Sequence, residues 1–306
     1  MDPNFADDLL AAIEEKGSPV CVGLDPVYDR LPKEFHSDLR DEVQRTAPIG
    51  HFCDQVLDIV APIVPAVKVQ SACFERYGAA GVELYHHVVH AAQERDLVVI
   101  GDVKRSDIGS TAQMYAEAHL RGLLTGFGPT TGIPDAITVS PYFGTDGIRP
   151  FVDLAAEEDR GVFLLVRTSN PSATEVQDFA DASGKRLFEH VAEMVARLGA
   201  GEDLIGDRGY SCVGAVVGAT YPEEARRLRE LMPQQIFLVP GYGAQGATAS
   251  DCAAAFKPDG TGAIVNASRS VIYAFSEPKS AGPDWKKAVE SAAREFADEI
   301  RAAIGK

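Results

Sequence analysis

The sequence predicts an α/β fold and, within that class, a (β/α)8 barrel in which residues 1–306 form a single domain. Three observations support this prediction. Eight short apolar runs alternate with stretches of helical periodicity. No change of composition marks a second domain. Polar residues follow the ends of the apolar runs, which is where the active sites of such barrels gather.

The composition argues against several classes of function. The chain has a formal net charge of −16 and an isoelectric point near 4.8. Such a surface repels nucleic acids and anionic membranes, so we expect neither as a partner. The five cysteines are scattered and show no CxxC spacing, which favours a reducing cytoplasm. No run reaches the ~18 apolar residues that a membrane span needs, and the acidic N-terminus is unlike a signal peptide.

The first half of the chain is predicted to contribute four strands. An amphipathic helix at 5–16, closed by Gly17, precedes the first of them. The strands are expected at 19–25, 64–70, from 97 onward, and 137–141. Helices are expected at 38–61, with an interruption near Pro48, at 72–95, from the end of the third strand to Leu120, and at 145–158. A Gly- and Thr-rich connection is expected at 125–134.

The stretch LVVIGDVKRSDIGST at 97–111 begins with apolar residues suited to a buried strand and continues with charged residues suited to catalysis. Its β-branched residues favour a strand, and side chains two residues apart share a face. Asp102 and Lys104 should therefore emerge side by side where the strand ends. Ser106 or Asp107 suits the N-cap of the following helix.

The second half repeats the alternation. Strands are expected at 162–169, 213–219, 237–241 and 263–268, and helices at 176–198, 222–231 and 285–304. A doubly wound open sheet is the structural alternative.

Many of the polar residues fall at or just after the end of a predicted strand. They are Asp25, Lys68, Asp102, Lys104, Ser140, Arg167, Gln245 and Arg269. Each alone could be an ordinary solvated residue, and for Arg167 that explanation is as good as a functional one. Two lysines and several aspartates meeting at one barrel mouth are harder to explain in this way, since charges that lie close together need partners.

The sequence GYGAQG at 241–246 formally matches the dinucleotide fingerprint GxGxxG. We reject that interpretation because only one further strand follows, whereas a dinucleotide-binding unit needs more chain. In a barrel, the loops after the seventh and eighth strands usually bind phosphate. Gly241 and Gly243 would let backbone N–H groups approach the phosphate, and Arg269 would add a charged fork. The alternative is that these glycines only make a turn.

The sequence DVKRSDIGST at 102–111 resembles the DxKxxDI signature of the orotidine 5′-monophosphate decarboxylase family. Residues in register around the barrel extend the resemblance: Asp25, Lys68, Pro240 and Gly241, Gln245, and Arg269. The chain is similar to the longer bacterial branch of the family, with extra segments near 28–48, 168–186 and 199–211.

The resemblance implies a homodimer that decarboxylates orotidine 5′-monophosphate to UMP. Asp107 and Ile108 would reach into the neighbouring subunit's site. Lys68, Asp102, Lys104 and the neighbour's Asp107 would form an alternating charge network, with Lys104 as the proton donor. The implied substrate contacts are Asp25, Lys68 and the neighbour's Thr111 at the ribose, Ser140 at the pyrimidine, Gln245 between base and phosphate, and Gly241, Tyr242 and Arg269 at the phosphate.

Decarboxylation of this kind requires fixed positive charge, because the electron pair left at C6 lies in the ring plane and the ring cannot delocalise it. An ammonium group meets that need, so no metal or organic cofactor is expected. His86, His87 and His90 lie on one predicted helix, but no carboxylate or cysteine completes a metal set.

Two other readings remain open. The chain could be another phosphate-binding barrel enzyme, such as a sugar-phosphate epimerase or decarboxylase. It could also be a non-catalytic sensor of a nucleotide monophosphate. The intact Lys104 argues against the sensor, because binding alone needs no proton donor.

Overall fold

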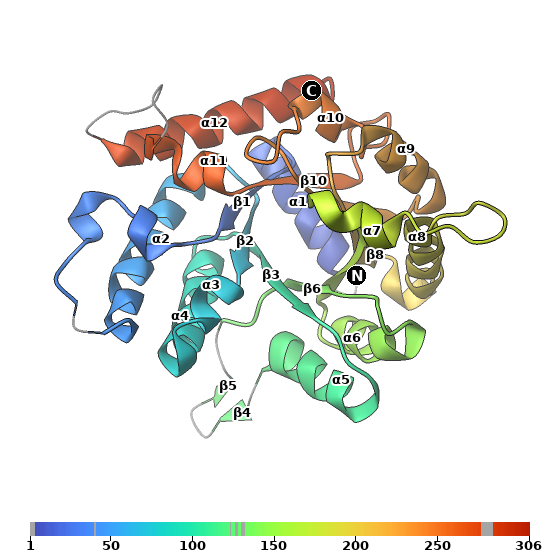
Figure 1. The fold of residues 1–306 in the computed structure, drawn as a ribbon, viewed down its shortest axis with the longest axis horizontal. Helices are drawn as coiled ribbons and strands as arrows, with labels where there is room; N and C mark the ends of the chain where they lie inside the picture. Colours follow the sequence, from blue (N-terminus) through green and yellow to red (C-terminus); the bar gives the residue numbers. More distant parts are fainter. Residues whose placement is uncertain (1–3, 40, 123, 126–127, 130–131, 277–283) are drawn as a thin grey trace.

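The computed structural model describes residues 4–39, 41–122, 124–125, 128–129, 132–276 and 284–306, and its main feature is a closed barrel of eight strands (Figure 1). These strands are β1 (Val20–Leu24), β2 (Ala66–Gln70), β3 (Val98–Arg105), β6 (Ala136–Val139), β7 (Gly161–Arg167), β8 (Ser211–Val217), β9 (Gln235–Pro240) and β10 (Ala263–Ala267). They pair in the order β1-β10-β9-β8-β7-β6-β3-β2, all in parallel.

The pairing of β1 with β10 closes the sheet. The predicted (β/α)8 barrel is therefore confirmed, and the open-sheet alternative is wrong. All eight predicted strands are present, with ends shifted by a few residues. The connection predicted at 125–134 contains a small antiparallel pair, β4 (Leu124–Thr125) and β5 (Gly128–Pro129). Positions 126–127 and 130–131 of that connection lie outside the described residues.

Helices surround the barrel. They are α1 (Phe5–Lys16), α2 (Thr46–Val60), α3 (Ala72–Glu75), α4 (Gly78–Gln93), α5 (Gly109–Ala116), α6 (Thr145–Glu157), α7 (Thr174–Gln177), α8 (Leu187–Leu198), α9 (Pro222–Leu231), α10 (Ala249–Ala253), α11 (Arg269–Ile272) and α12 (Trp285–Ala303). The predicted first helix is confirmed: Asn4 caps it, and Gly17 ends it at a φ of 68°. Phe5 packs edge-on against Phe163 of β7, with ring centroids 5.8 Å apart.

Two of the predicted helices in the first half need correction. The helix expected at 38–61 begins only at Thr46, and Pro48 does not interrupt it, because a proline in the first turn removes an N–H group that would have no partner there. The helix expected at 72–95 is two helices, since Gly78, the first residue of the second helix, adopts a φ of 65°.

Two further helix predictions are wrong in detail. The N-cap of α5 is Ile108 rather than Ser106 or Asp107, and a π-helical turn at Glu117–Arg121 carries the chain on through Leu120. The helix expected at 176–198 is α7 followed, after a loop, by α8. The last helix is confirmed, ending at Ala303.

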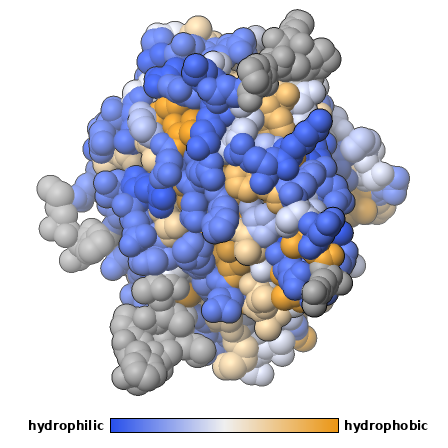
Figure 2. Space-filling view, turned by 90° about the vertical axis from the view of Figure 1, so that its left-hand side faces the viewer, coloured by the Kyte–Doolittle hydropathy of each residue, from blue (hydrophilic) through white to orange (hydrophobic). Residues whose placement is uncertain are grey.

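The barrel strands are buried along most of their length, because helices cover their outer face and side chains fill the interior. The outer surface differs: Figure 2 shows a face on which hydrophilic side chains predominate and apolar ones occur in scattered spots. Within the described residues, no helix is both long enough and apolar enough to cross a membrane. The polar groups that break the apolar interior lie at the carboxyl ends of the strands.

Candidate active site

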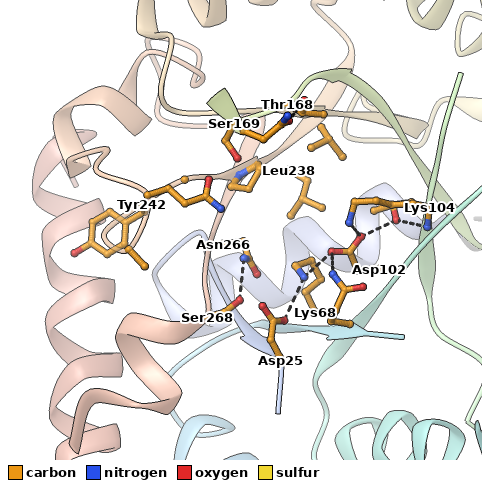
Figure 3. A pocket seen from close by; sticks show the side chains of 18 of the residues that line it. Asp25, Lys68, Asp102, Lys104, Thr168, Ser169, Leu238, Tyr242, Asn266 and Ser268 are labelled. Atoms are coloured by element: carbon orange, nitrogen blue, oxygen red, sulfur yellow. Dashed lines mark hydrogen bonds and ion pairs between the residues drawn. The ribbon is translucent and has the colours of Figure 1, made fainter. Parts of the chain in front are cut away.

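A cavity of about 410 Å³ opens at the carboxyl ends of the barrel strands. Its walls come from the ends of β1, β2, β3, β6, β7, β8, β9 and β10 and from the loops after them (Figure 3). The residues that line it are Asp25, Lys68, Gln70, Asp102, Lys104, Thr138, Leu165, Thr168, Ser169, Asn170, Val216, Leu238, Pro240, Gly241, Tyr242, Ala244, Gln245, Asn266, Ser268 and Arg269. Most of the residues predicted from strand ends therefore share one cavity.

The Asp102 carboxylate lies between two lysines. Its Oδ1 is 2.5 Å from Nζ of Lys104, and its Oδ2 is 2.8 Å from Nζ of Lys68. Asp102 is 6% exposed, and burial by itself would raise its pKa, but the two ammonium groups outweigh that effect and hold the pKa well below its ordinary value. The carboxylate is therefore fixed in its charged form.

Lys68 is as buried as its partner. Burial by itself would lower the pKa of its ammonium, yet the charges of Asp102 and Asp25 outweigh it and raise the pKa above the ordinary value. Oδ1 of Asp25 is 3.7 Å from the Lys68 Nζ atom. The charges thus alternate from Asp25 through Lys68 and Asp102 to Lys104, as the sequence predicts for strand ends that converge.

Gln70 and Thr138 complete the bonding of Asp102, and the sequence analysis missed both. Gln70 Nε2 donates to Oδ2 at 2.9 Å, and the Thr138 hydroxyl donates to Oδ1 at 2.9 Å. Gln70 shares a strand face with Lys68, two residues before it, so strand periodicity could have found it. With these donors, each oxygen of Asp102 has two partners.

Lys104 adopts a left-handed backbone conformation, with a φ of 46°. Its backbone N–H donates to the Thr138 hydroxyl at 3.0 Å, at a place where the pairing of β3 with β6 is irregular. Such a conformation costs about 1–3 kcal/mol in a residue other than glycine, and it is typical of functional positions. The Lys104 side chain is 47% exposed at the mouth, where it can meet a ligand.

A buried tyrosine holds the turn that carries Asp25. The Tyr273 hydroxyl accepts a hydrogen bond from the Val27 N–H at 2.7 Å and donates to the Asp25 carbonyl at 3.2 Å. Tyr273 is 1% exposed and stacks on Phe52. The backbone at Asp25 is therefore fixed from behind by a residue distant in the sequence.

The other end of the cavity holds the predicted anion site. Gly241, Gln245 and Arg269 line it, and Gly241 and Gly243 adopt φ values of 116° and 67°, which favour glycine. The Tyr242 side chain points away from the cavity in Figure 3, and its hydroxyl donates to Glu299 Oε2 at 2.6 Å. The Tyr242 ring instead packs on Phe296 of α12, with ring centroids 4.7 Å apart.

Four of the predicted site residues do not line this chain's cavity: Asp107, Ile108, Thr111 and Ser140. Ser140 follows β6, and its N–H donates to the Arg105 carbonyl at 2.9 Å. The wall across the pocket from Asp25 and Lys68 is built instead by Thr168 and Ser169, which follow β7 (Figure 3).

Arg167 is neither a solvated strand-end residue nor a cavity residue. It is fully buried, and its guanidinium pairs with Glu224 at 2.6 Å and with Asp178 at 2.8 Å. The solvated explanation is therefore wrong, because Arg167 belongs to a buried salt-bridge network with Asp178 and Glu224, and the residue lies outside the cavity lining.

In the part of the chain that the structure describes, no group of three or more His, Cys, Asp or Glu side chains is arranged to hold a metal ion. Two of the three histidines of α4 pair instead with single carboxylates, His87 with Asp54 and His90 with Glu94, both at 3.6 Å.

The fold and the cavity define a barrel with an alternating array of charged groups at one end of the cavity and the predicted anion-binding residues at the other. A sequence model of the orotidine 5′-phosphate decarboxylase / HUMPS family matches residues 18–283. The chain belongs to this family.

Individual relatives agree with this assignment. The chain is 42% identical over 303 residues to the orotidine 5′-phosphate decarboxylase of Rhodopirellula baltica, covering 97% of this chain and 99% of that protein. Two solved structures are similar. A candidate orotidine 5′-phosphate decarboxylase from Streptomyces avermitilis has a TM-score of 0.79 and 36% identity, over 99% of this chain and 97% of that one. The Leishmania donovani OMP decarboxylase has a TM-score of 0.75 and 28% identity, over 99% and 100%.

Proposed function

We propose that the chain decarboxylates orotidine 5′-monophosphate to UMP and CO2, the last step of pyrimidine nucleotide synthesis, with Lys104 as the proton donor. Family membership and the near full-length relatives support a carboxy-lyase of this specificity. The observation that carries the role of Lys104 is its ammonium group, which lies at the cavity mouth with Nζ 2.5 Å from the Asp102 carboxylate. The sensor alternative offers no reason for a lysine held in a strained backbone conformation.

In this mechanism, the bond from C6 to the carboxylate breaks and leaves an electron pair at C6. The Lys104 ammonium stabilises that pair and then transfers one proton to C6, giving UMP and a neutral amine. Asp102 holds the ammonium in place and faces the carboxylate that leaves. Solvent returns the proton to Lys104 before the next turnover.

The remaining cavity residues suit the rest of the substrate. Asp25 and Lys68 would contact the ribose hydroxyls, while Arg269, Gln245 and the backbone around Gly241 would bind the phosphate. We assign the far edge of the pyrimidine to the wall of Thr168 and Ser169 in place of Ser140. That wall lies across the cavity from Lys68, whereas Ser140 lies outside the cavity lining.

The test of this function is turnover by the purified chain, followed as loss of orotate absorbance. Turnover at the same rate with and without chelator is the expected result, because Lys104 supplies the positive charge. Absence of turnover would remove the proposed function. Turnover that a chelator abolishes would contradict the role of Lys104.

We further propose a homodimer in which each site is completed by Asp107, Ile108 and Thr111 of the partner subunit. In a single chain these residues are outside the cavity lining, and among the described residues the Ile108 N–H is the one group that donates to Asp107 Oδ1. Several large apolar side chains near them are exposed: Ile108, Met114, Tyr115, Tyr142 and Phe143. Such a patch is typical of a protein–protein interface.

Two broader expectations also remain proposals. The chain is a single domain, which is supported by one hydrophobic core that includes residues from α1 to α12. It works in the cytoplasm, which is supported by five free cysteines, four of them buried.

A further inference from the structure

The segment from 168 to 186 links β7 to α8, and the family function gives most of it no role. Its first three residues, Thr168, Ser169 and Asn170, line the cavity. The rest lies behind them and contains a 3-10 turn at Pro171–Ala173 followed by α7 (Figure 1, yellow-green). The segment could therefore fix the positions of Thr168 and Ser169 in the cavity wall.

A buried arginine anchors the base of this segment. Arg167, the last residue of β7, is paired with Glu224 of α9 and with Asp178, which follows α7. Its guanidinium also lies 4.1 Å from the ring centroid of Tyr221. Because a buried guanidinium is costly without its partners, the C-terminal end of α7, which Asp178 caps, has little freedom relative to the barrel.

Gln177, at the end of α7, reaches back to the cavity wall and bonds Thr168 twice. Its Oε1 accepts from the Thr168 N–H at 3.0 Å, and its Nε2 donates to the Thr168 hydroxyl at 2.7 Å. That hydroxyl in turn donates to Asn170 Oδ1 at 2.7 Å. One amide thus fixes both the backbone and the side chain at the start of the wall.

These bonds decide which polar group the wall can offer to a ligand. The Thr168 hydroxyl is occupied, since it accepts from Gln177 and donates to Asn170. Within the described part of the chain, no hydrogen bond engages the hydroxyl of Ser169, which lies between these two residues and lines the cavity.

We propose that Gln177 is a positioning residue for pyrimidine recognition: by clamping Thr168 it holds the Ser169 hydroxyl toward the base of the bound nucleotide. This inference rests on the proposed function for the identity of the ligand. Gln177 itself lies outside the cavity lining and acts only through the wall.

The test compares two ligands that share a phosphorylated ribose, UMP and ribose 5-phosphate, of which only UMP has a base. Gln177→Leu removes both bonds to Thr168, and the longer bond of 3.4 Å that Arg167 Nη1 donates to Gln177 Oε1, at similar volume. Because each lost hydrogen bond weakens a positioned contact modestly, we expect the Kd of UMP to rise about 5- to 30-fold. The Kd of ribose 5-phosphate should change less than about 2-fold, because that ligand does not reach the wall. Calorimetry gives both constants without turnover.

Two further variants make the comparison specific. Gln177→Glu keeps an acceptor for the Thr168 N–H, so it should recover most of the UMP affinity. Glu175→Leu places the same new side chain on the exposed face of the same helix and should leave both constants unchanged. If Gln177→Leu does not fold, Gln177→Asn carries the test, because its amide is one methylene too short to reach Thr168.

Unchanged UMP affinity in a folded Gln177→Leu or Gln177→Asn variant would overturn the proposal. An equal loss of affinity for both ligands would also overturn it, since that would indicate a general disturbance of the site. Failure of the unaltered chain to decarboxylate its substrate would count against the proposed function alone, because the calorimetric comparison does not depend on catalysis.

Discussion

The Nζ atom of Lys104 lies 2.5 Å from Oδ1 of Asp102, two residues earlier on the same strand. The carboxylate orients the ammonium and is in turn held by Lys68, Gln70 and Thr138. The position of the Lys104 ammonium is therefore set by groups other than the proposed proton donor itself, and each of these groups can be replaced separately.

Lys104→Ala should lower kcat by a factor on the order of 10⁴ while UMP binding persists, because the proposed proton donor is lost but the proposed phosphate-binding residues remain. The half-exposed side chain contributes little to folding, so the melting temperature should change little. Absorbance assays and calorimetry measure the two effects. Lys287→Ala, at an exposed lysine of α12, is the control and should behave like the unaltered chain. Near-normal turnover by Lys104→Ala would reassign the proton donor.

Asp102→Asn should lower the free energy of unfolding as well as the activity. It leaves the buried Lys68 ammonium with only Asp25, at 3.7 Å, to balance its charge. Removing one partner of a buried pair costs about 3 kcal/mol or more. Urea denaturation followed by circular dichroism should show this loss, and a free energy of unfolding equal to that of the unaltered chain would contradict the pairing.

The same pair predicts how stability depends on pH. The pKa of Asp102 is lowered below its ordinary 3.8, so its contribution is present above that value and is lost as pH falls through the folded-state pKa. The pKa of Lys68 is raised above its ordinary 10.5, so its contribution is present below that value and is lost as pH rises through the folded-state pKa. The pair's contribution should be constant between about pH 5 and pH 9. Melting curves should show a smaller acid loss in Asp102→Asn than in the unaltered chain; an identical loss would show that other groups are responsible.

Mixing two inactive variants should restore activity if subunits share sites. Asp102→Asn and Asp107→Asn each disable every site of their own dimers. A mixed dimer contains one site with both native aspartates, so random exchange should recover about a quarter of full activity. The measurement is turnover after co-refolding equal amounts, and absence of recovery in a mixture shown to contain mixed dimers would refute the exchange.

Tyr273→Phe should raise the KM for the nucleotide about 5- to 10-fold with little change in kcat, because two hydrogen bonds that fix the Asp25 turn are lost while the ring packing is kept. Tyr210→Phe is the matched control. Its hydroxyl bonds Thr261 at 2.7 Å, and it precedes β8, at the amino ends of the strands. Equal KM values for both variants would show that the turn does not depend on Tyr273.

The sequence was sufficient for the barrel and for its charged array. Short apolar strands ending in Asp25, Lys68, Asp102 and Lys104 place those side chains at one mouth, since parallel strands end at the same edge. Ser140 satisfied the same rule, yet the cavity uses Thr168 and Ser169 after the next strand. Periodicity indicates that a residue follows a strand; it does not indicate how far the loop after that strand leans over the opening.

The features that escaped prediction depend on contacts between distant segments or on backbone angles. The Tyr273 hydroxyl meets the carbonyl of Asp25, which is 248 residues away. The left-handed conformation of Lys104 has no sequence signal, because such angles are usually adopted by glycine. The sequence places Gln177 near the start of one long helix, whereas in the structure it ends α7, and a loop separates it from α8.

The two lysines and two aspartates that one chain contributes to the mouth carry formal charges that cancel, and the partner's Asp107 would add a further negative charge. A substrate carboxylate beside Lys104 therefore meets no excess of positive charge. The reacting end of the nucleotide should contribute little favourable binding free energy. Attraction must come from the distant phosphate, which Arg269 and the glycine loop can hold. A nucleoside without its phosphate should accordingly be a very poor substrate, although every charged side chain around its base would be in place.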